Sequence, residues 1–140
     1  MEPLLSVRGL TKSFKKNRVL CGINFDVMPG EVLCILGPNG AGKSTTINIL
    51  TSALSANRGE ISFKGEPISD DLRTYKQQLG IVPQDIALYE ELSAERNLRF
   101  FASLYGLRGS KLDAAVEKAR VFAGLIDRRQ DQVTTFPVGM

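Results

Sequence analysis

Short apolar runs and alternating stretches predict the strands of this chain. The run from Val32 to Leu36 is continuously apolar and too short for a buried helix, and residues 79–82 form a second compact apolar run. Such runs are typical of strands that are covered on both faces in a parallel sheet. The segments 4–14 and 19–27 alternate more loosely, with a polar turn between them. They predict an antiparallel pair of strands, and the short segment 60–63 is expected to continue that sheet.

Apolar residues after position 43 show the helical spacing i, i+3 and i+7. The residues of this apolar face are Ile47, Leu50 and Leu54, widened by Ile49 and Ala53. A face of this width can pack on a sheet. The segment 70–78 predicts a second helix, which is short and polar.

Two longer helices are predicted in the second half of the chain. Ser93 can cap one that runs to Tyr105, with Gly106 as its stop. Ser110 begins the other in the pattern of a capping box, with Asp113 in place of the usual Glu or Gln. The face of this helix that we expect to be buried comprises Leu112, Ala115, Val116, Ala119, Phe122 and Ala123.

The segment 121–127 resembles an apolar strand that ends in a metal-binding aspartate, Asp127. However, residues 121–123 continue the helical period, and Gly124 fits a helix C-cap with Leu125 as its apolar follower. We therefore interpret the segment as the end of a helix. No other carboxylate follows a buried strand, so the sequence predicts neither a general base nor a second Mg²⁺ anchor.

A glycine-rich loop lies between the apolar run 32–36 and the first helix. It fits the pattern G-x-x-x-x-G-K-[ST] and reads Gly37-Pro38-Asn39-Gly40-Ala41-Gly42-Lys43-Ser44. Its glycines let backbone N–H groups point inward at a helix N-terminus, which makes an anion-binding nest. Lys43 can reach the β- and γ-phosphates of a nucleotide, and the Ser44 hydroxyl suits Mg²⁺. Because strand, loop and helix follow in the order that the motif requires, phosphate binding is favoured over an ordinary Gly-rich turn.

Composition and charge narrow the class of protein. Fractions of 43% hydrophobic and 24% charged residues are ordinary for a soluble globular chain, which argues against disorder. A net charge of +3 from scattered residues gives no argument for nucleic acid binding. The basic turn 15–18 fits a solvated loop better than a phosphate-contacting patch.

Cysteine, histidine and hydropathy set further bounds. Cys21 and Cys34, the only cysteines, lie in strand-like runs and are expected to be buried reduced thiols, which favours a cytosolic location. Histidine is absent, which excludes a histidine base or metal ligand within this chain. The apolar stretches fall short of the ~20 residues of a membrane span. Any membrane link is therefore expected to go through a partner.

Two residues outside the loop could contact a nucleotide. Phe14 is either a core aromatic of the first strand or a flat platform on which a base stacks. Gln84 lies just beyond the predicted strand 79–82, where open α/β sheets bind ligands. It could bind Mg²⁺ or orient a water, and otherwise it is a solvated loop residue. The apolar residues from Ile86 to Tyr89 are expected in a loop, which suggests a docking surface.

Together these motifs resemble the ATP-binding cassette (ABC) family, and in particular the N-terminal portion of the ATP-binding subunit of an ABC transporter. Residues 37–45, ending in Thr45, look like the Walker A loop of that family. Phe14 stands where the family has an adenine-stacking aromatic, and residues 82–84 resemble its Q-loop. The stretch 86–107 resembles ATPases that are paired with drug and polyketide exporters.

The resemblance implies an α/β fold of the P-loop NTPase, ABC ATPase type. Residues of about 1–84 would form the nucleotide-binding core and an N-terminal antiparallel β subdomain, and about 85–136 a helical subdomain. ATP and Mg²⁺ are the implied ligands, with Ser44 and Gln84 at the metal. A membrane-spanning permease subunit would bind around residues 84–89, and a second ATP-binding subunit would complete the protein at the cytoplasmic face of the membrane.

The sequence departs from the family pattern near its end. Phe136-Pro137-Val138-Gly139 stands in place of the Leu-Ser-Gly-Gly signature. Pro137 has neither hydroxyl nor N–H, and Val138 adds a side chain where a backbone amide should approach phosphate. The sequence stops at Met140, before the Walker B strand, catalytic glutamate and switch histidine of the family. We therefore expect a fold truncated before that strand and assign no catalytic residue.

Three functions follow as hypotheses. The first is a non-catalytic ATP·Mg²⁺-binding fragment. The second is part of a longer ATPase whose hydrolysis of ATP drives export through a membrane partner. The third is another P-loop protein, a kinase or a GTPase. The absence of an Asn-Lys-x-Asp motif argues against a GTPase, and the ABC-like wording of the loop argues against a kinase.

Overall fold

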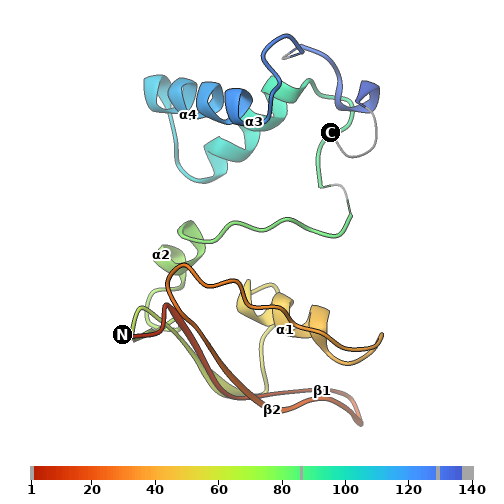
Figure 1. Cartoon of the computed structure of the whole chain (residues 1–140), viewed down its shortest axis with the longest axis vertical. Coiled ribbons are helices and arrows are strands. Elements are labelled where there is room, and N and C mark those ends of the chain that lie inside the picture. Colours follow the sequence, from red (N-terminus) through yellow and green to blue (C-terminus); the bar gives the residue numbers. More distant parts are fainter. Residues whose placement is uncertain (1, 86, 129, 137–140) are drawn as a thin grey trace. The chain divides into compact units, whose positions relative to one another are not determined.

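The computed structural model describes residues 2–85, 87–128 and 130–136. The chain divides into two compact units, Met1–Ile81 and Val82–Met140 (Figure 1). The first unit contains a sheet with the glycine-rich loop and the helix that follows it, and the second unit is helical. No helix of the described residues is long and apolar enough to cross a membrane.

The sheet of the first unit is antiparallel, with the strand order β2-β1-β3-β4. Strands β1 (Leu5–Phe14) and β2 (Asn17–Val27) form the predicted pair, and β3 (Arg58–Phe63) continues the sheet before the two-residue β4 (Glu66–Pro67). The prediction of an antiparallel sheet is thus confirmed. Its core is a cluster of apolar residues that includes Val7, Leu10, Leu20, Ile49 and Ile61.

Helix α1 (Lys43–Leu50) packs on this sheet through a face that agrees with the predicted one in part, because Ile49 and Leu50 pack in or against the core as predicted. Thr46 and Ile49 are buried, whereas Ile47 is 45% exposed and Leu54 lies beyond the end of the helix. The reason is that Gly42 lies close to β2. Thr46 and Ile49 follow Gly42 by four and seven residues, so they lie on the same side of the helix and also face the sheet. Leu54 still packs against the core from the loop that follows.

The two apolar runs are not strands in this structure, which corrects the prediction. Residues 32–36 and 79–82 have no strand assignment, and Val32, Leu36 and Val82 are 88%, 90% and 96% exposed. A strand needs neighbouring strands, and neither run is part of the sheet that the structure describes. Cys34, within the first run, is therefore exposed, as is Cys21 on β2. Both cysteines are free, but the prediction that they are buried is wrong.

Helix α2 (Leu72–Gln77) confirms the short polar helix predicted near the end of the first unit. Asp71 is its N-cap and accepts a hydrogen bond of 3.0 Å from the Thr74 N–H. Tyr75 is the buried residue of this helix, and its hydroxyl donates to the carbonyl of Leu50 over 2.7 Å. This contact ties α2 to the end of α1.

The second unit consists of helices α3 (Ala94–Leu104) and α4 (Gly109–Phe122), followed by the 3-10 turn η1 (Val133–Thr135). Ser93 caps α3 as predicted, and its Oγ accepts the N–H of Arg96 at 3.3 Å. Ser110 does not cap α4, since that helix begins one residue earlier, at Gly109 with Arg108 as the N-cap and without a side-chain cap.

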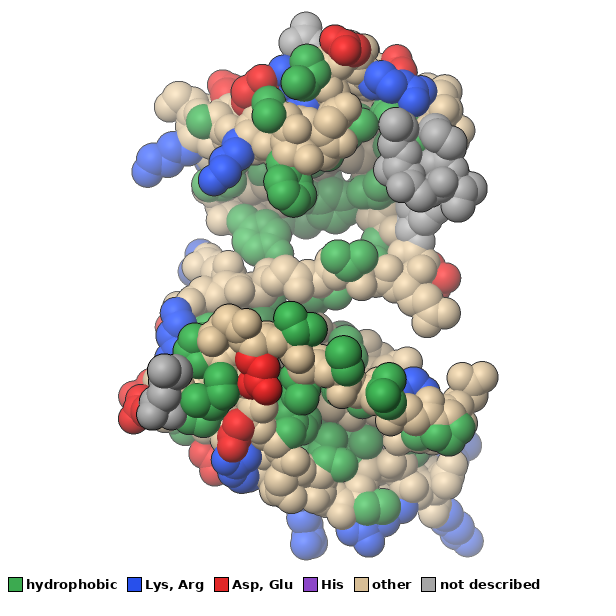
Figure 2. Space-filling view, in the orientation of Figure 1, with side chains coloured by type: hydrophobic (Ala, Val, Ile, Leu, Met, Phe, Trp, Pro, Cys, Tyr) green, Lys and Arg blue, Asp and Glu red, His purple; other side chains and the backbone are tan. Residues whose placement is uncertain are grey.

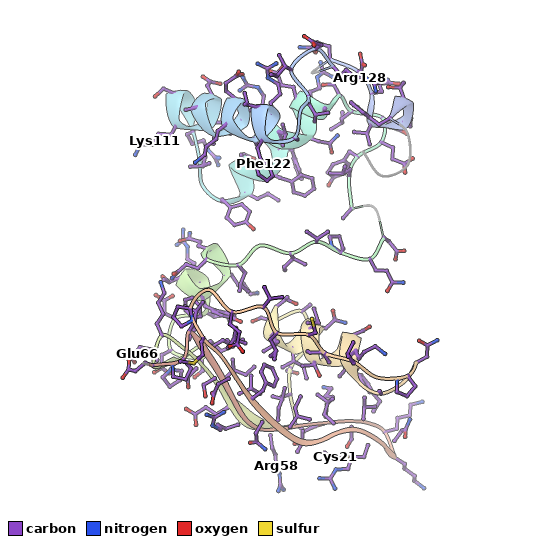
Figure 3. All side chains as sticks on the ribbon, in the orientation of Figure 1. Cys21, Arg58, Glu66, Lys111, Phe122 and Arg128 are labelled. Carbon is purple, nitrogen blue, oxygen red and sulfur yellow. The ribbon has the colours of Figure 1, made fainter. Side chains whose placement is uncertain are left out.

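The end of α4 confirms the helical interpretation of residues 121–123. Gly124 has a φ of +67°, and the N–H of Leu125 donates to the carbonyl of Arg120 over 3.0 Å, as in a Schellman cap. Phe122, however, is 93% exposed and projects away from α4 (Figure 3). Val116 is the buried residue of the helix, so the face expected to be buried is narrower than predicted.

Candidate phosphate-binding loop

The glycine-rich loop enters α1 through a residue that must be glycine. Gly42 has a φ of +93°, and a Cβ there would lie 2.6 Å from Cδ2 of Leu20 and 3.2 Å from the carbonyl oxygen of Val19. Gly40 also has a positive φ, +83°, but open space surrounds its Cβ position. The loop is therefore packed closely against β2 at Gly42, whereas at Gly40 it has a positive φ but no close neighbour.

Lys43 closes the loop from within. Its Nζ donates a hydrogen bond of 2.7 Å to the carbonyl of Pro38 and another to the carbonyl of Gly37. The N–H of Ala41 donates to the same Pro38 carbonyl over 3.2 Å. At the helix side, the Thr46 hydroxyl donates 2.9 Å to the carbonyl of Gly42. The ammonium group thus lies inside the loop, at the N-terminus of α1.

This arrangement fits an anionic ligand. The first N–H groups of a helix have no partners within the helix, and its N-terminus carries a partial positive charge. Residues 37–41 and Ser44 are exposed, whereas Gly42 is buried and Thr45 is half-buried. The loop therefore presents a cation, helix N–H groups and a hydroxyl to solvent at one place, which are the groups that a polyphosphate with Mg²⁺ requires.

Phe14 lies at the end of β1 and is 46% exposed. This exposure is inconsistent with a core aromatic. Lys12 lies beside it, with Nζ 5.4 Å from the ring centroid and a hydrogen bond of 2.5 Å from the same Nζ to the carbonyl of Ser55. The stacking platform is the remaining interpretation of Phe14, and its role toward a base stays a prediction.

Gln84 belongs to the second unit, where it is exposed in a bend. Its predicted contact with Mg²⁺ stays a prediction. Among the residues that the structure describes, no group of three or more His, Cys, Asp or Glu could hold a metal ion.

The stretch after Gln84 carries exposed apolar side chains, as predicted. Ile86 lies outside the described residues, but Leu88 and Tyr89 are each about half-exposed. Tyr89 packs edge-on against Phe100 of α3, with ring centroids 5.0 Å apart. Leu88 also lines a groove of about 200 Å³, together with Leu98, Phe101 and other residues of the second unit.

Asn97 is a site residue that the sequence analysis missed. It is 3% exposed, and its side-chain amide binds the backbone of the stretch that follows Gln84. The signal in the sequence is that Asn97 is a polar residue at a position where the apolar face of the predicted helix would have an apolar one. Ala94, Asn97, Leu98 and Phe101 follow the spacing i, i+3, i+4, i+7.

Comparison with known proteins decides the family. The family model described as ABC transporter matches residues 20–140 of the chain. The chain belongs to the ABC transporter family. The match runs from β2 through the glycine-rich loop and both units.

Curated relatives support this assignment. This chain is 37% identical, over 98% of its length, to the linearmycin resistance ATP-binding protein LnrL of Bacillus subtilis (strain 168). It is 33% identical, over its whole length, to the Nod factor export ATP-binding protein I of Cupriavidus metallidurans. The chain spans 44% and 46% of these relatives, which is less than half of their length.

Solved structures support the fold. The ABC chain resembles a solved ATP-binding subunit of an ABC transporter with 34% identity and a TM-score of 0.79, covering 96% of this chain and 56% of that one. It also resembles cbiO1 of Clostridium perfringens, part of the ABC transporter complex cbiONQ, with 26% identity and a TM-score of 0.84 over 98% and 57% of the two chains. The α/β fold of the ABC ATPase type, with its antiparallel sheet and its helical part, is thereby confirmed.

The signature region falls at the edge of what the structure describes. Pro137, Val138 and Gly139 lie outside the described residues. Phe136 is described, and the guanidinium carbon of Arg128 lies 4.3 Å from its ring centroid. The expected weakness of the signature at Pro137 and Val138 thus stays a prediction from the sequence.

Proposed function

We propose that this chain is the nucleotide-binding portion of an ABC exporter ATP-binding subunit and that it holds ATP·Mg²⁺ in the loop 37–45. The observation that carries the proposal is the position of Lys43, whose Nζ lies among the loop carbonyls at the N-terminus of α1. That ammonium would exchange the carbonyls of Gly37 and Pro38 for β- and γ-phosphate oxygens. Family membership and the names of the relatives support ATP as the nucleotide.

The other site residues take the roles that their exposure allows. The Ser44 hydroxyl would bind Mg²⁺, with Gln84 as a second oxygen ligand. The half-exposed ring of Phe14 would stack on the adenine base. The backbone N–H groups of the loop and of the first turn of α1 would bind phosphate oxygens. Each of these groups binds or orients the ligand, and none of them is assigned to abstract a proton.

The complete protein would couple the hydrolysis of this ATP to transport. Relatives are named for linearmycin resistance, multidrug transport and Nod factor export, which supports an export function. We assign the contact with a membrane-spanning permease subunit to residues 84–89, because Leu88 and Tyr89 expose apolar surface there. A second ATP-binding subunit would supply the other half of the site, and the assembly would lie at the cytoplasmic face of the membrane.

A calorimetric titration of the chain with ATP·Mg²⁺ tests the proposal, with phosphate release followed in the same samples. Lys43→Ala is expected to weaken binding about tenfold to hundredfold, because a charged hydrogen bond contributes about 1.5–3 kcal/mol. Lys111→Ala, which removes an exposed lysine of α4 (Figure 3), is the matched control and is expected to bind like the wild type.

Binding without phosphate release would favour the non-catalytic fragment over a self-sufficient ATPase. A folded wild-type chain that binds no ATP, or a Lys43→Ala chain that binds as tightly as the wild type, would overturn the assignment of the loop. Tighter binding of GTP than of ATP would overturn the assignment of ATP as the nucleotide.

A further inference from the structure

Asn97 is a buried polar side chain of the second unit that nucleotide binding does not use. It lies on α3 and is only 3% exposed. Its Oδ1 accepts the N–H of Tyr89 at 2.8 Å, and its Nδ2 donates to the carbonyl of the same residue at 2.9 Å. Nδ2 also lies 3.2 Å from the carbonyl of Ser93. The Asn97 side chain thus binds the backbone N–H and the backbone carbonyl of Tyr89, and also the carbonyl of Ser93, the residue that caps α3.

The stretch that Asn97 holds, residues 89–93, is also hydrogen-bonded to residues 131–134, which precede Phe136 in the chain. The N–H of Val133 donates to the carbonyl of Leu92 over 3.2 Å, and the N–H of Ala94 donates to the carbonyl of Asp131 over 3.1 Å. A backbone bridge joins Ser93 to Gln132 between these two bonds. Residues 89–94 and 131–134 therefore form one short hydrogen-bonded ladder, which we call the loop ladder.

The Asn97 amide fixes one side of the loop ladder. An irregular loop such as 89–93 has many backbone conformations when it is free, and fixing each residue in one conformation costs conformational entropy. Hydrogen bonds from a side chain that is itself held in a helix compensate part of this cost. With the carbonyl groups of residues 90 and 92 so placed, the N–H groups of Thr134 and Val133 find their acceptors. Without Asn97, these acceptors lose their fixed position.

We propose that Asn97 is a positioning residue that makes the partner-facing stretch 88–93 and the segment 131–134 move as one body. A shift imposed on Leu88 and Tyr89 would then reach the chain just before Phe136 through the loop ladder and the first turn of α3, without passing through α4. The biological use of this link rests on the proposed permease contact. The link itself is a property of the second unit that can be measured without nucleotide or partner.

Amide hydrogen exchange of the whole chain, resolved by residue with NMR, tests the link. In Asn97→Ala we expect the protection of the N–H groups of Tyr89 and Val133 to fall at least tenfold, while the protection of the α4 amides stays as in the wild type. Arg99→Ala is the matched control on the same helix. It removes the 2.7 Å ion pair with Asp113 of α4 and the 3.2 Å ion pair with Glu95 of α3, and neither of these partners belongs to the loop ladder. We expect that variant to leave the protection of Val133 unchanged.

A second variant separates the link from a general loss of structure. In Asn97→Asp, a carboxylate can still accept from Tyr89 but repels the carbonyls of Tyr89 and Ser93, and a protonated carboxyl can donate to one of them. Protection of Val133, measured relative to the wild type at the same pH, should therefore recover as the pH falls. The neighbouring carboxylates of Glu90, Glu95 and Asp131 and the guanidinium groups of Arg96 and Arg128 are present in both proteins, so this comparison cancels their titration.

Each outcome decides the proposal. Unchanged protection of Val133 in Asn97→Ala overturns it, as does equal loss in Arg99→Ala, and so does an Asn97→Asp variant that shows no recovery in acid. A wild-type chain that fails to bind ATP overturns the proposed function, but it leaves the exchange comparison valid. The two proposals can therefore fail separately.

Discussion

Gly42 joins the phosphate-binding loop to the packing of the sheet. Its positive φ and the 2.6 Å that would separate a Cβ from Leu20 both act against any other residue. We expect Gly42→Ala to lower the free energy of unfolding by about 1–3 kcal/mol, because it adds left-handed strain and a steric overlap with β2. Gly40→Ala should cost less, since that position has a positive φ but open space. Urea unfolding followed by circular dichroism measures both, and equal losses would contradict the packing argument.

At this scale the sequence predicts residues that act through local pattern and misses those that act through tertiary contacts. The spacing of Gly37, Gly42, Lys43 and Ser44 predicts a phosphate loop, because that motif is continuous in the chain. The choice between core and platform for Phe14 needed its exposure, which depends on how far β1 extends beyond the core. Asn97 was missed because its partners, the backbone groups of Tyr89, are visible only after the loop has folded onto α3.

Helix α2 provides a pH-dependent test of an element. The Thr74 hydroxyl and the Thr74 N–H donate hydrogen bonds to Asp71, which lower the pKa of that carboxyl from its ordinary value. A carboxyl with a folded pKa below its unfolded value of about 3.9 stabilises the fold above that pH. This contribution is lost as the pH falls through the lowered folded pKa, because the protonated group accepts hydrogen bonds less well.

Asp71→Asn keeps a residue that can cap a helix but removes the titration. We therefore expect the wild type to lose stability relative to Asp71→Asn as the pH falls from 5 to 2.5, with a constant difference between pH 5 and 7. Urea midpoints of both proteins across this range measure the effect. The other carboxylates are common to both proteins, so parallel pH profiles would mean that the cap does not contribute.

The antiparallel strands and the helices were predicted well, whereas the two strands predicted for a parallel sheet do not form. Strands β1 and β2 follow from their alternation, because the tight turn between them brings the partners together. Residues 32–36 and 79–82 carry an equally clear strand pattern but no strand. A run of apolar residues indicates that the segment prefers to be buried, but a parallel strand forms only where other strands lie on its edges. The start of α4 differs for another reason. The helix begins at Gly109 and not after the predicted cap Ser110, and helix ends commonly differ from prediction by one or two residues.

The whole chain exposes large apolar side chains in each unit, some of which are visible in Figure 2. In the first unit Val32 and Leu36 are nearly fully exposed, and no strand of the described residues pairs with the backbone around them. Apolar segments with free N–H and C=O groups pair readily with other chains. We therefore expect the wild-type chain to self-associate as its concentration rises, and the double variant Val32→Lys with Leu36→Lys to do so much less.

Added charge alone could also reduce association, so the comparison needs a control of equal charge. Asn48→Lys with Gln77→Lys adds the same two charges at exposed polar positions and should associate as the wild type does. Sedimentation velocity at several concentrations distinguishes the three proteins, and thermal unfolding shows whether the β1–β3 sheet is retained. If both double variants dissociate equally, charge repulsion rather than the apolar segment controls association. A wild type that stays monomeric at all concentrations and melts cooperatively would mean that the exposed segment 32–36 is shielded in solution.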